Sequence, residues 1–303
     1  MRRMRVAIAS FNGMPPEFRD DERLVGLLAE RGVETVNPPW DDPSVDWHSY
    51  DLVVARTPWD YTSRLEEFLD WADGVGERLE NPPAVIRWNS DKRYLADLRD
   101  DGLPVVETTY VAPGEQPPPI GAEVVIKPSV SGGARDTGRF GPGSADAGRA
   151  LVERICARGG TAMIQPYLAS VEASGETAVI MIGGEHSHVL RKGALLSPDE
   201  VAPVREGDAL GVAEVMYDPD LVVAGSADQA ELALAERILA AVHARFGADP
   251  LIARVDMLRD GEGEPVLLEL EAIEPNLYFE QSPGAAERLA DAIVARARRS
   301  GAA

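Results

Sequence analysis

The chain carries a group of carboxylates near its end whose spacing could bind a divalent cation. The run 251–258 has the alternation of a strand, which would place Arg254 and Asp256 on one face. A second strand pattern follows a short turn and would place Glu269 and Glu271 on one face. Two charged faces therefore come from neighbouring segments.

A hairpin would bring these faces together. If the turn is centred between Glu262 and Gly263, Asp256 lies opposite Glu269 and the carboxylates converge. Two like charges about 4 Å apart cost on the order of 4 kcal/mol at an effective dielectric constant of about 20, so such a cluster should hold a cation or keep some members protonated. Oxygen ligands favour Mg²⁺ or Mn²⁺ over zinc or copper. The alternative is a solvated strand face in an acidic protein.

Lysine is rare in this chain, and its few positions are therefore informative. Of 30 Lys and Arg residues only three are lysine, at Lys92, Lys127 and Lys192. A codon bias toward arginine explains the scarcity. The remaining lysines are candidates for places where a compact ammonium cannot be replaced by the planar guanidinium group.

A glycine-rich loop follows the second lysine. Lys127 ends an apolar run, and the segment 129–143 after it contains five glycines. Such a loop lets backbone N–H groups approach phosphate oxygens while the lysine supplies charge. The alternative is a mobile surface loop. The sequence contains no Walker A motif and no G-x-G-x-x-G after a strand, which disfavours P-loop and Rossmann nucleotide sites.

The first hundred residues alternate between strand and helix patterns. We expect strands at 5–10, 51–56 and 84–86, and helices at 17–31 and 65–79. This alternation indicates a βαβ lobe with a parallel sheet.

The rest of the chain mixes helices with antiparallel strands. A hairpin over 176–192, turning at Gly183 and Gly184, would put His186, His188 and Lys192 on one face. We expect the histidines to be surface or packing residues. The other expected elements are a helix from a Ser90 cap through Leu98, a strand at 123–127, a helix at 145–158, a strand at 161–165, a polar loop over 194–225, and helices at 227–246 and 284–299.

Composition limits the class of protein. The chain has 303 residues, so two or three subdomains are expected. Its formal charge of −21 makes nucleic acid and anionic membranes poor partners. A single cysteine, Cys156, excludes an internal disulfide and a Cys-based zinc site. The basic start precedes an apolar run too short for a signal peptide, which favours a cytoplasmic enzyme.

Taken in order, these segments resemble the ATP-grasp ligases, particularly the glutathione synthetase and D-alanine:D-alanine ligase branch, over about residues 88–300. The matching segments are Asp91-Lys92 with Gly102-Leu-Pro-Val-Val-Glu-Thr108, Val125-Ile-Lys-Pro128, Ile164-Gln-Pro-Tyr-Leu168, Ser174-Gly-Glu-Thr177, Ala253-Arg-Val-Asp-Met-Leu258 and Leu267-Leu-Glu-Leu-Glu271. The resemblance implies an α/β protein with α+β lobes, namely an ATP-grasp fold preceded by an N-terminal βαβ domain. It implies domains at 1–88, 89–175 (the lid lobe) and 176–303 (the metal-bearing lobe).

The resemblance also implies roles for individual residues. Glu271 stands where the family usually has Asn, which leaves its role as a third metal ligand less certain. The implied set is Lys92, Lys127 and Lys192 on the ATP phosphates, Ser131, Gly132 and Gly133 in the phosphate lid, Gln165 and Leu168 on adenine, Glu176 on ribose, Asp256, Glu269 and Glu271 on Mg²⁺ or Mn²⁺, and Arg254 with Lys127 as catalytic groups.

The N-terminal lobe resembles a narrower subgroup that includes the cyclo-ligase of the cycloserine pathway. The segments that carry this resemblance are 40–47, 55–61 and 86–89. Arg56 ends a buried strand, where α/β sheets expose ligand-binding residues, so it could pair with a substrate carboxylate. Alternatively Arg56 pairs with Asp60, and Trp59 and Tyr61 are packing residues. The candidate substrate residues are Arg56, Arg135, Glu274 and Asn276.

The expected activity is ATP-dependent amide formation on a small amino-acid-like substrate. The family chemistry passes through an acyl phosphate and releases ADP and phosphate, with Arg254 facing the oxyanion. The alternatives are an intramolecular cyclo-ligase of the O-ureidoserine type, a kinase that stops at the phosphorylated product, and a nucleotide-binding module without turnover. The resemblance suggests a role in amino acid or antibiotic biosynthesis, and a homodimer.

Overall fold

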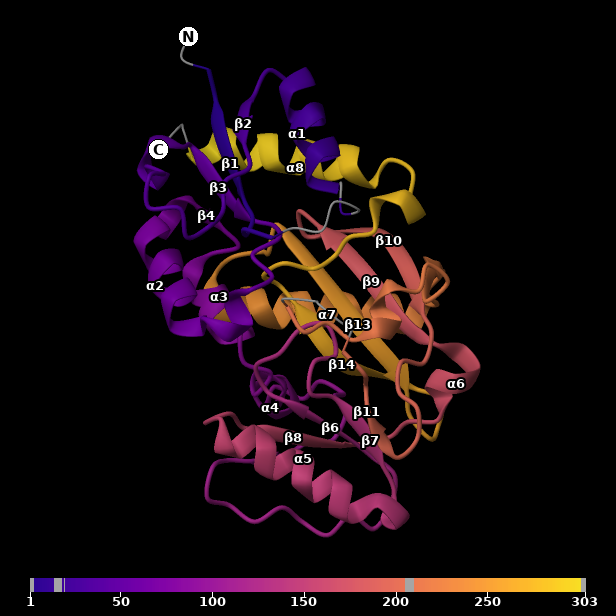
Figure 1. Cartoon of the computed structure of the whole chain (residues 1–303). Helices are drawn as coiled ribbons and strands as arrows, with labels where there is room; N and C mark the ends of the chain where they lie inside the picture. The colour runs from indigo at the N-terminus through magenta and orange to yellow at the C-terminus, as the bar shows by residue number, and fades with distance from the viewer. Residues whose placement is uncertain (1–2, 14–17, 19, 205–209, 301–303) are drawn as a thin grey trace.

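A computed structural model describes residues 3–13, 18, 20–204 and 210–300. Within these residues the strands form three sheets, which lie one below another in Figure 1. The sheets come from the N-terminal lobe, the middle of the chain, and the segments after residue 175. The predicted domain boundaries at 88 and 175 stay a prediction.

The N-terminal sheet is parallel and has the strand order β2-β1-β3-β4. Its inner residues include Ile8 and Val54, both fully buried. Its elements are β1 (Arg5–Ala9), α1 (Asp20–Glu30), β2 (Glu34–Val36), β3 (Leu52–Ala55), α2 (Leu65–Val75) and β4 (Leu79–Glu80). The βαβ prediction is confirmed for this lobe.

The strand expected at 84–86 is wrong, because this segment belongs to a helix, α3 (Pro83–Asn89). Pro83 occupies the first turn, where its fixed φ favours a helix start. A three-residue apolar run is too short to distinguish the two periods. Ser90 follows α3 instead of capping the next helix, α4 (Tyr94–Asp100).

The middle sheet has the order β11-β7-β6-β8-β5 and is covered by one helix, α5. Apolar side chains of α5, such as Leu151 and Ile155, pack on Ile126 and Phe140. The elements are β5 (Thr109–Val111), β6 (Val124–Pro128), β7 (Gly138–Phe140), α5 (Ala145–Ala157), β8 (Ala162–Pro166) and β11 (Glu200–Val201).

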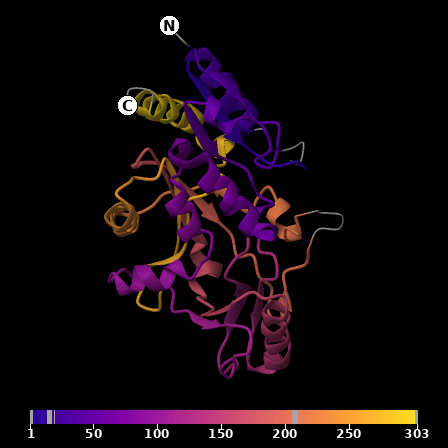
Figure 2. The same ribbon diagram turned by 90° about the vertical axis from the view of Figure 1, so that its left-hand side faces the viewer.

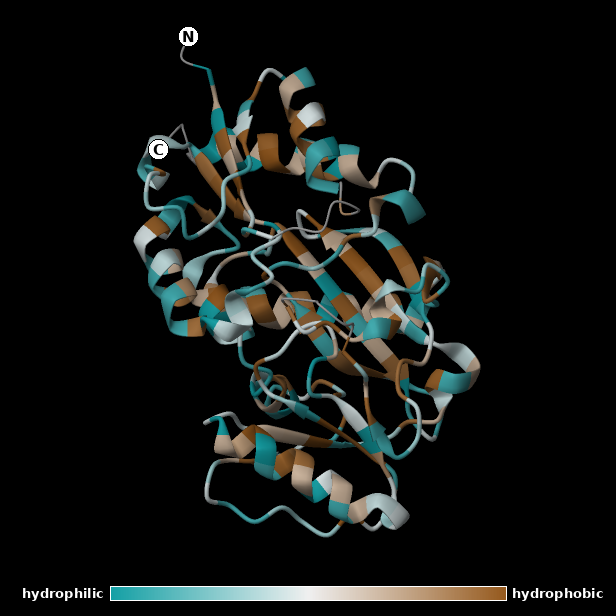
Figure 3. Ribbon diagram, viewed as in Figure 1, coloured by the Kyte–Doolittle hydropathy of each residue, from teal (hydrophilic) through white to brown (hydrophobic). Residues whose placement is uncertain are grey.

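The third sheet is antiparallel, in the order β12-β10-β9-β13-β14, and a helix packs on each face. Val179 and Val255 face α7, whereas Ala178 and Ile180 face α8. The elements are α6 (Ser170–Ser174), β9 (Glu176–Ile182), β10 (Glu185–Lys192), β12 (Val222–Ala224), α7 (Gln229–Phe246), β13 (Ile252–Arg259), β14 (Pro265–Glu271) and α8 (Ala285–Ser300). The brown inner sides of the strands and of α8 show this layering in Figure 3.

The C-terminal helix α8 is shared by two sheets. It lies beside α1 in both ribbon views (Figures 1 and 2), and Leu289 and Ile293 join a single cluster that contains Ile8 and Leu28 of the N-terminal lobe as well as Ile180 of the third sheet. The N-terminal and C-terminal segments therefore have a common core.

Two local predictions need correction. The expected loop over 194–225 contains β11 and β12, and β11 extends the middle sheet along β7. A bulge between His186 and His188 in β10 places these histidines on opposite faces, so only His188 shares a face with Lys192. In the described residues, no helix combines the length and hydropathy that a membrane span requires.

Candidate active site

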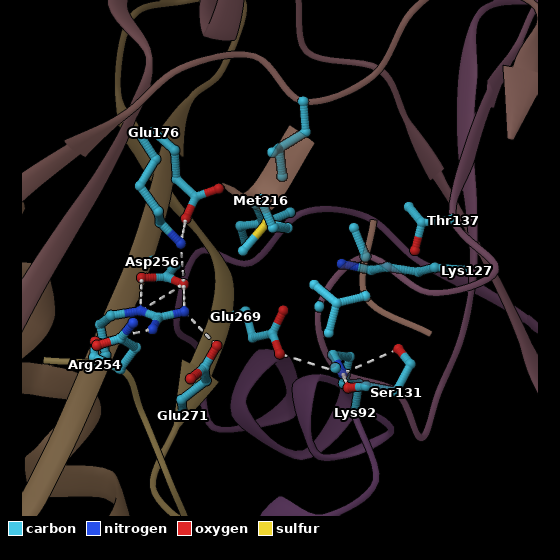
Figure 4. Close-up of a pocket in the computed structure, with 18 of the residues that line it drawn as sticks. Lys92, Lys127, Ser131, Thr137, Glu176, Met216, Arg254, Asp256, Glu269 and Glu271 are labelled. Carbon is cyan, nitrogen blue, oxygen red and sulfur yellow. Dashed lines mark hydrogen bonds and ion pairs between the residues drawn. The ribbon is translucent and has the colours of Figure 1, made fainter. Parts of the chain in front are cut away.

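A deep pocket lies between the middle sheet and the third sheet, with part of its wall from the N-terminal lobe. Figure 4 shows that Lys92, Lys127 and the carboxylates of β13 and β14 approach it from different elements. Lys127 comes from β6, Lys192 from β10 and Asp256 from β13. Side chains far apart in sequence are thus gathered around one space.

The predicted pairing of Asp256 with Glu269 is confirmed, although the turn is centred on Glu262 and not between Glu262 and Gly263. Asp256 pairs with Glu269, and Arg254 pairs with Glu271. The register shifts by one residue between Asp256 and Met257, so Leu268 forms a bulge. The bulge brings all three carboxylates to the pocket side of the sheet.

Asp256 is 2% exposed and is held by two cations. Lys192 Nζ lies 2.7 Å from Asp256 Oδ2, and Arg254 Nη2 lies 2.9 Å from the same oxygen. Burial alone would raise the pKa of Asp256, but Arg254 and Lys192 outweigh it and lower this pKa below the usual range. Asp256 is therefore charged at neutral pH.

The other two carboxylates also have cationic partners. Glu269 Oε1 is 3.2 Å from Lys92 Nζ, and Glu271 pairs with Arg254. Lys92 and Lys127 lower the pKa of Glu269 against the effect of burial, whereas burial raises the pKa of Glu271.

The fit to a divalent cation depends on these ion pairs. Among the residues that the structure describes, no three His, Cys, Asp or Glu side chains form a ready metal-ion cluster. Lys92, Lys192 and Arg254 form ion pairs with these carboxylates. The donor set, all carboxylate oxygen, is the type that a hard cation such as Mg²⁺ prefers.

Lys127 has no carboxylate at hydrogen-bond distance. It is 8% exposed, and within the described residues no ion pair or hydrogen bond joins its Nζ atom to another group. Burial lowers the pKa of Lys127. Its ammonium group points into the pocket in Figure 4. A buried cation without a partner is a site that an anion would neutralise.

The glycine-rich loop is fixed on both sides of the pocket. Lys92 Nζ donates to Ser131 O at 2.6 Å, and Gly133 O accepts from Ala213 N at 2.8 Å. A Cβ atom at Gly133 would stand 2.8 Å from the Val212 side chain, and Gly133 has a φ of +59°. Only glycine suits this close approach.

Arg135, a predicted substrate residue, is not among the residues that line the pocket. It donates to Leu210 O at 3.2 Å and to Thr62 Oγ1 at 2.9 Å. It thereby ties the glycine-rich loop to the N-terminal lobe. Gly132 and Ser131 line the pocket, as expected.

The residues predicted for adenine and ribose line the pocket as well. Gln165 is 2% exposed; its Nε2 donates to Thr108 Oγ1 at 2.9 Å, and its Oε1 has no partner among the described residues. Leu168 lies nearby in the wall. Burial raises the pKa of Glu176 to about 7, while Lys192, its ion-pair partner, opposes this.

Arg56 is a structural residue. It is 1% exposed, its Nη1 donates to Pro275 O at 2.8 Å, and its Nε lies 3.4 Å from Asp21 Oδ1. The alternative pairing with Asp60 is wrong, because Asp60 accepts from Trp40 at 2.7 Å and pairs with Arg64, and the role of Arg56 toward a substrate stays a prediction. Arg56, which directly follows β3, thus binds other parts of the same chain.

Glu274 and Asn276 do line the pocket, together with residues that sequence reasoning left undecided. Trp59 and Tyr61 belong to the pocket wall and also pack on the core of the N-terminal lobe, so their alternative role as packing residues is confirmed too. Their position after the carboxyl end of β3 is the signal that could have identified them.

Comparisons with known proteins match the N-terminal lobe by itself and also nearly the whole chain. Residues 6–81 match the family described as the N-terminal domain of D-cycloserine synthetase DcsG. The cycloserine biosynthesis protein DcsG of Streptomyces lavendulae is 36% identical over 297 residues, which cover 93% of each chain. A crystal structure of D-cycloserine synthetase DcsG has a TM-score of 0.85 and 33% identity, and covers 97% of this chain and 99% of that one.

A more distant structure shares the fold alone. The ATP-grasp ligase PsnB, solved with minimal precursor, Mg and ADP, has a TM-score of 0.60 and 18% identity, and covers 98% of this chain and 99% of its own. The chain therefore belongs to the DcsG family of ATP-grasp ligases, enzymes that form C–N bonds.

Proposed function

We propose that this enzyme uses ATP to activate a substrate carboxylate as an acyl phosphate and then closes an amide within the same small, amino-acid-like molecule. ADP and phosphate are released. The observation that carries the proposal is the unpaired, buried ammonium of Lys127 in a pocket that also holds Lys92, Lys192 and the carboxylates of β13 and β14.

The phosphate end of the pocket supplies charge on two sides. Lys92 and Lys127 would bind the phosphates of ATP from the lid side, and Lys192, the ion-pair partner of Asp256, would bind them from the third sheet. Asp256, Glu269 and Glu271 would hold magnesium, which supplies neutralisation of phosphate charge when bound.

Anion binding here has a direct electrostatic reason. A lysine that exchanges its carboxylate partner for a phosphate would still have a negatively charged partner. The carboxylate that it leaves could then bind the metal. Rearrangement of the ion pairs thus couples the two ligands.

Arg254 is the expected partner of the developing oxyanion. It is 7% exposed and shares its guanidinium among Asp256, Glu271 and Asn276 O. Fixed in this way, it provides positive charge that needs little reorganisation during the reaction.

A buried hydrogen-bond acceptor without a partner in the described residues supports adenine binding in this pocket. Gln165 Oε1 is buried without a partner and would accept a hydrogen bond from an amino group of the base.

The relatives are named for cycloserine biosynthesis, which favours cyclisation of one molecule over the joining of two. The test is to incubate the protein with ATP, Mg²⁺ and O-ureidoserine carrying ¹⁸O in its carboxylate. We expect ¹⁸O in the released phosphate, as an acyl phosphate requires, and a cyclic product lighter than the substrate. A product heavier than the substrate would indicate two-substrate ligation, and phosphate without ¹⁸O would contradict the acyl phosphate.

A further inference from the structure

The chain after β14 forms a platform that four side chains hold in place. Consecutive carbonyl groups from residue 274 to residue 277 each accept a hydrogen bond from a side chain of a different residue. The pairs are Trp59 Nε1 to Glu274 O at 3.3 Å, Arg56 Nη1 to Pro275 O at 2.8 Å, Arg254 Nη1 to Asn276 O at 3.3 Å and His188 Nε2 to Leu277 O at 2.9 Å. The donors come from the N-terminal lobe, β13 and β10, so both lobes fix this segment.

Side chains alternate along the platform. Leu277 and Phe279 are buried, at 0% and 1% exposed. Glu274, Asn276 and Tyr278 line the pocket. An irregular segment is thereby given the two-sided character of a strand, with a polar side toward the substrate space.

Glu274 differs from the carboxylates of β13 and β14. Each of those has a lysine or arginine partner, whereas no ion pair joins Glu274 to any described residue. Its hydrogen-bond partner is the phenol of Tyr61, a buried residue of the N-terminal lobe. Burial, followed by the charge of Glu271, raises the pKa of Glu274 to about 8. Glu280, also in the wall, is exposed and has no comparable environment.

Lys92, Lys127, Lys192 and Arg254 also line the pocket, but within the described residues none of them forms an ion pair with Glu274. The charge of Lys92 opposes the rise in the pKa of Glu274 and is outweighed by burial. A group that meets Glu274 and Asn276 therefore should donate hydrogen bonds, as a nitrogen nucleophile does.

Building on the proposed ligase function, we infer that Glu274 binds the attacking nitrogen of the substrate and accepts its proton, with Tyr61 as the positioning residue. The nitrogen lone pair forms the C–N bond to the acyl carbon. The C–O bond to phosphate breaks, and its electron pair leaves with the phosphate. The proton lost by nitrogen moves to a carboxylate oxygen of Glu274.

Glu274→Gln separates this step from carboxylate activation, because glutamine keeps the shape and an acceptor oxygen for Tyr61 but cannot take the proton. With O-ureidoserine, ATP and Mg²⁺, we expect cyclic product to fall about 100-fold, the scale of general-base catalysis. Hydroxylamine, added to trap the acyl phosphate as a hydroxamate, should be consumed at a rate within about threefold of wild type, since activation precedes the proton transfer.

Two further variants complete the test. Tyr61→Phe should lower cyclisation less than Glu274→Gln does, again with hydroxamate formation retained. Glu262→Gln, the same substitution in the exposed β13–β14 turn, should behave as wild type. Thermal unfolding of each variant checks that it is folded.

The outcomes separate the two proposals. Wild-type cyclisation by Glu274→Gln overturns the inference, and so does loss of both products in a folded variant, because Glu274 would then act during activation. If the wild-type protein makes neither hydroxamate nor ADP, the proposed function fails, and the inference fails with it.

Discussion

The two ends of the pocket differ in how their carboxylates are partnered. At the phosphate end, Asp256 and Lys192 neutralise one another before any ligand arrives. At the other end, no described cation forms an ion pair with Glu274, and burial raises its pKa to about 8, so the group can take up or release a proton near neutral pH. The ion pairs around Asp256 can exchange their partners for ligands. Glu274, in contrast, can change its protonation state. Four predictions test this contrast.

The largest effect is expected from Asp256→Asn. Removing this carboxylate takes away the proposed metal ligand, so ADP release should fall by about 1000-fold, a loss of about 4 kcal/mol of transition-state stabilisation. Because Asp256 also partners buried Arg254 and Lys192, the unfolding temperature should fall too. ADP release that survives in a folded variant would show that the metal assignment is wrong.

Lys127→Met should reduce ADP release by about 100-fold, through loss of a phosphate contact. It should also stabilise the protein at pH 7. Burial lowers the pKa of Lys127, so a charged Lys127 costs stability at neutral pH, and this cost declines as pH rises from the folded pKa to the unfolded value. Thermal unfolding at pH 7 and pH 10 measures the change. A less stable variant at pH 7 would mean that Lys127 has a partner in solution.

Gln165→Leu should raise the KM for ATP about tenfold, which corresponds to about 1.4 kcal/mol. The maximal rate should change little, because the contact is remote from the reacting atoms. Steady-state ADP release over a range of ATP concentrations gives both values. An unchanged KM would place the base elsewhere.

The smallest effect concerns the stability of Glu274→Gln. The pKa of Glu274 is raised to about 8 in the folded protein, so the folded state retains a proton that the unfolded state loses above about pH 4.3. Stability contributed by this group therefore falls between that pH and about 8. The unfolding temperature of the variant relative to wild type should rise by a few degrees from pH 5 to pH 8. A constant difference would indicate an ordinary carboxyl group.

The phosphate end could be predicted from sequence because its residues lie on regular strands. The alternation of Arg254 and Asp256, and the hairpin register with Glu269, follow from a period of two. Even there, the bulge at Leu268 and the ion pairs were not predictable from the pattern, since both depend on contacts between elements.

The other end could be predicted only in part. Glu274 and Asn276 were identified from resemblance, but the platform is irregular, and its conformation is fixed by donors such as Arg56 and His188 from distant segments. No local periodicity encodes such bonds. For the same reason Arg56 looked like a ligand-binding residue at a strand end, although its charge is used within the protein.

The shared position of α8 has a consequence for how this chain becomes a protein. The strand that contains Ile8 and the helix that contains Ile293 are far apart in the sequence, yet both belong to one core. The first sheet lacks its apolar cover until α8 docks on it, and contacts of such long sequence separation form slowly. Loss of α8 should therefore expose apolar surface on two sheets at once.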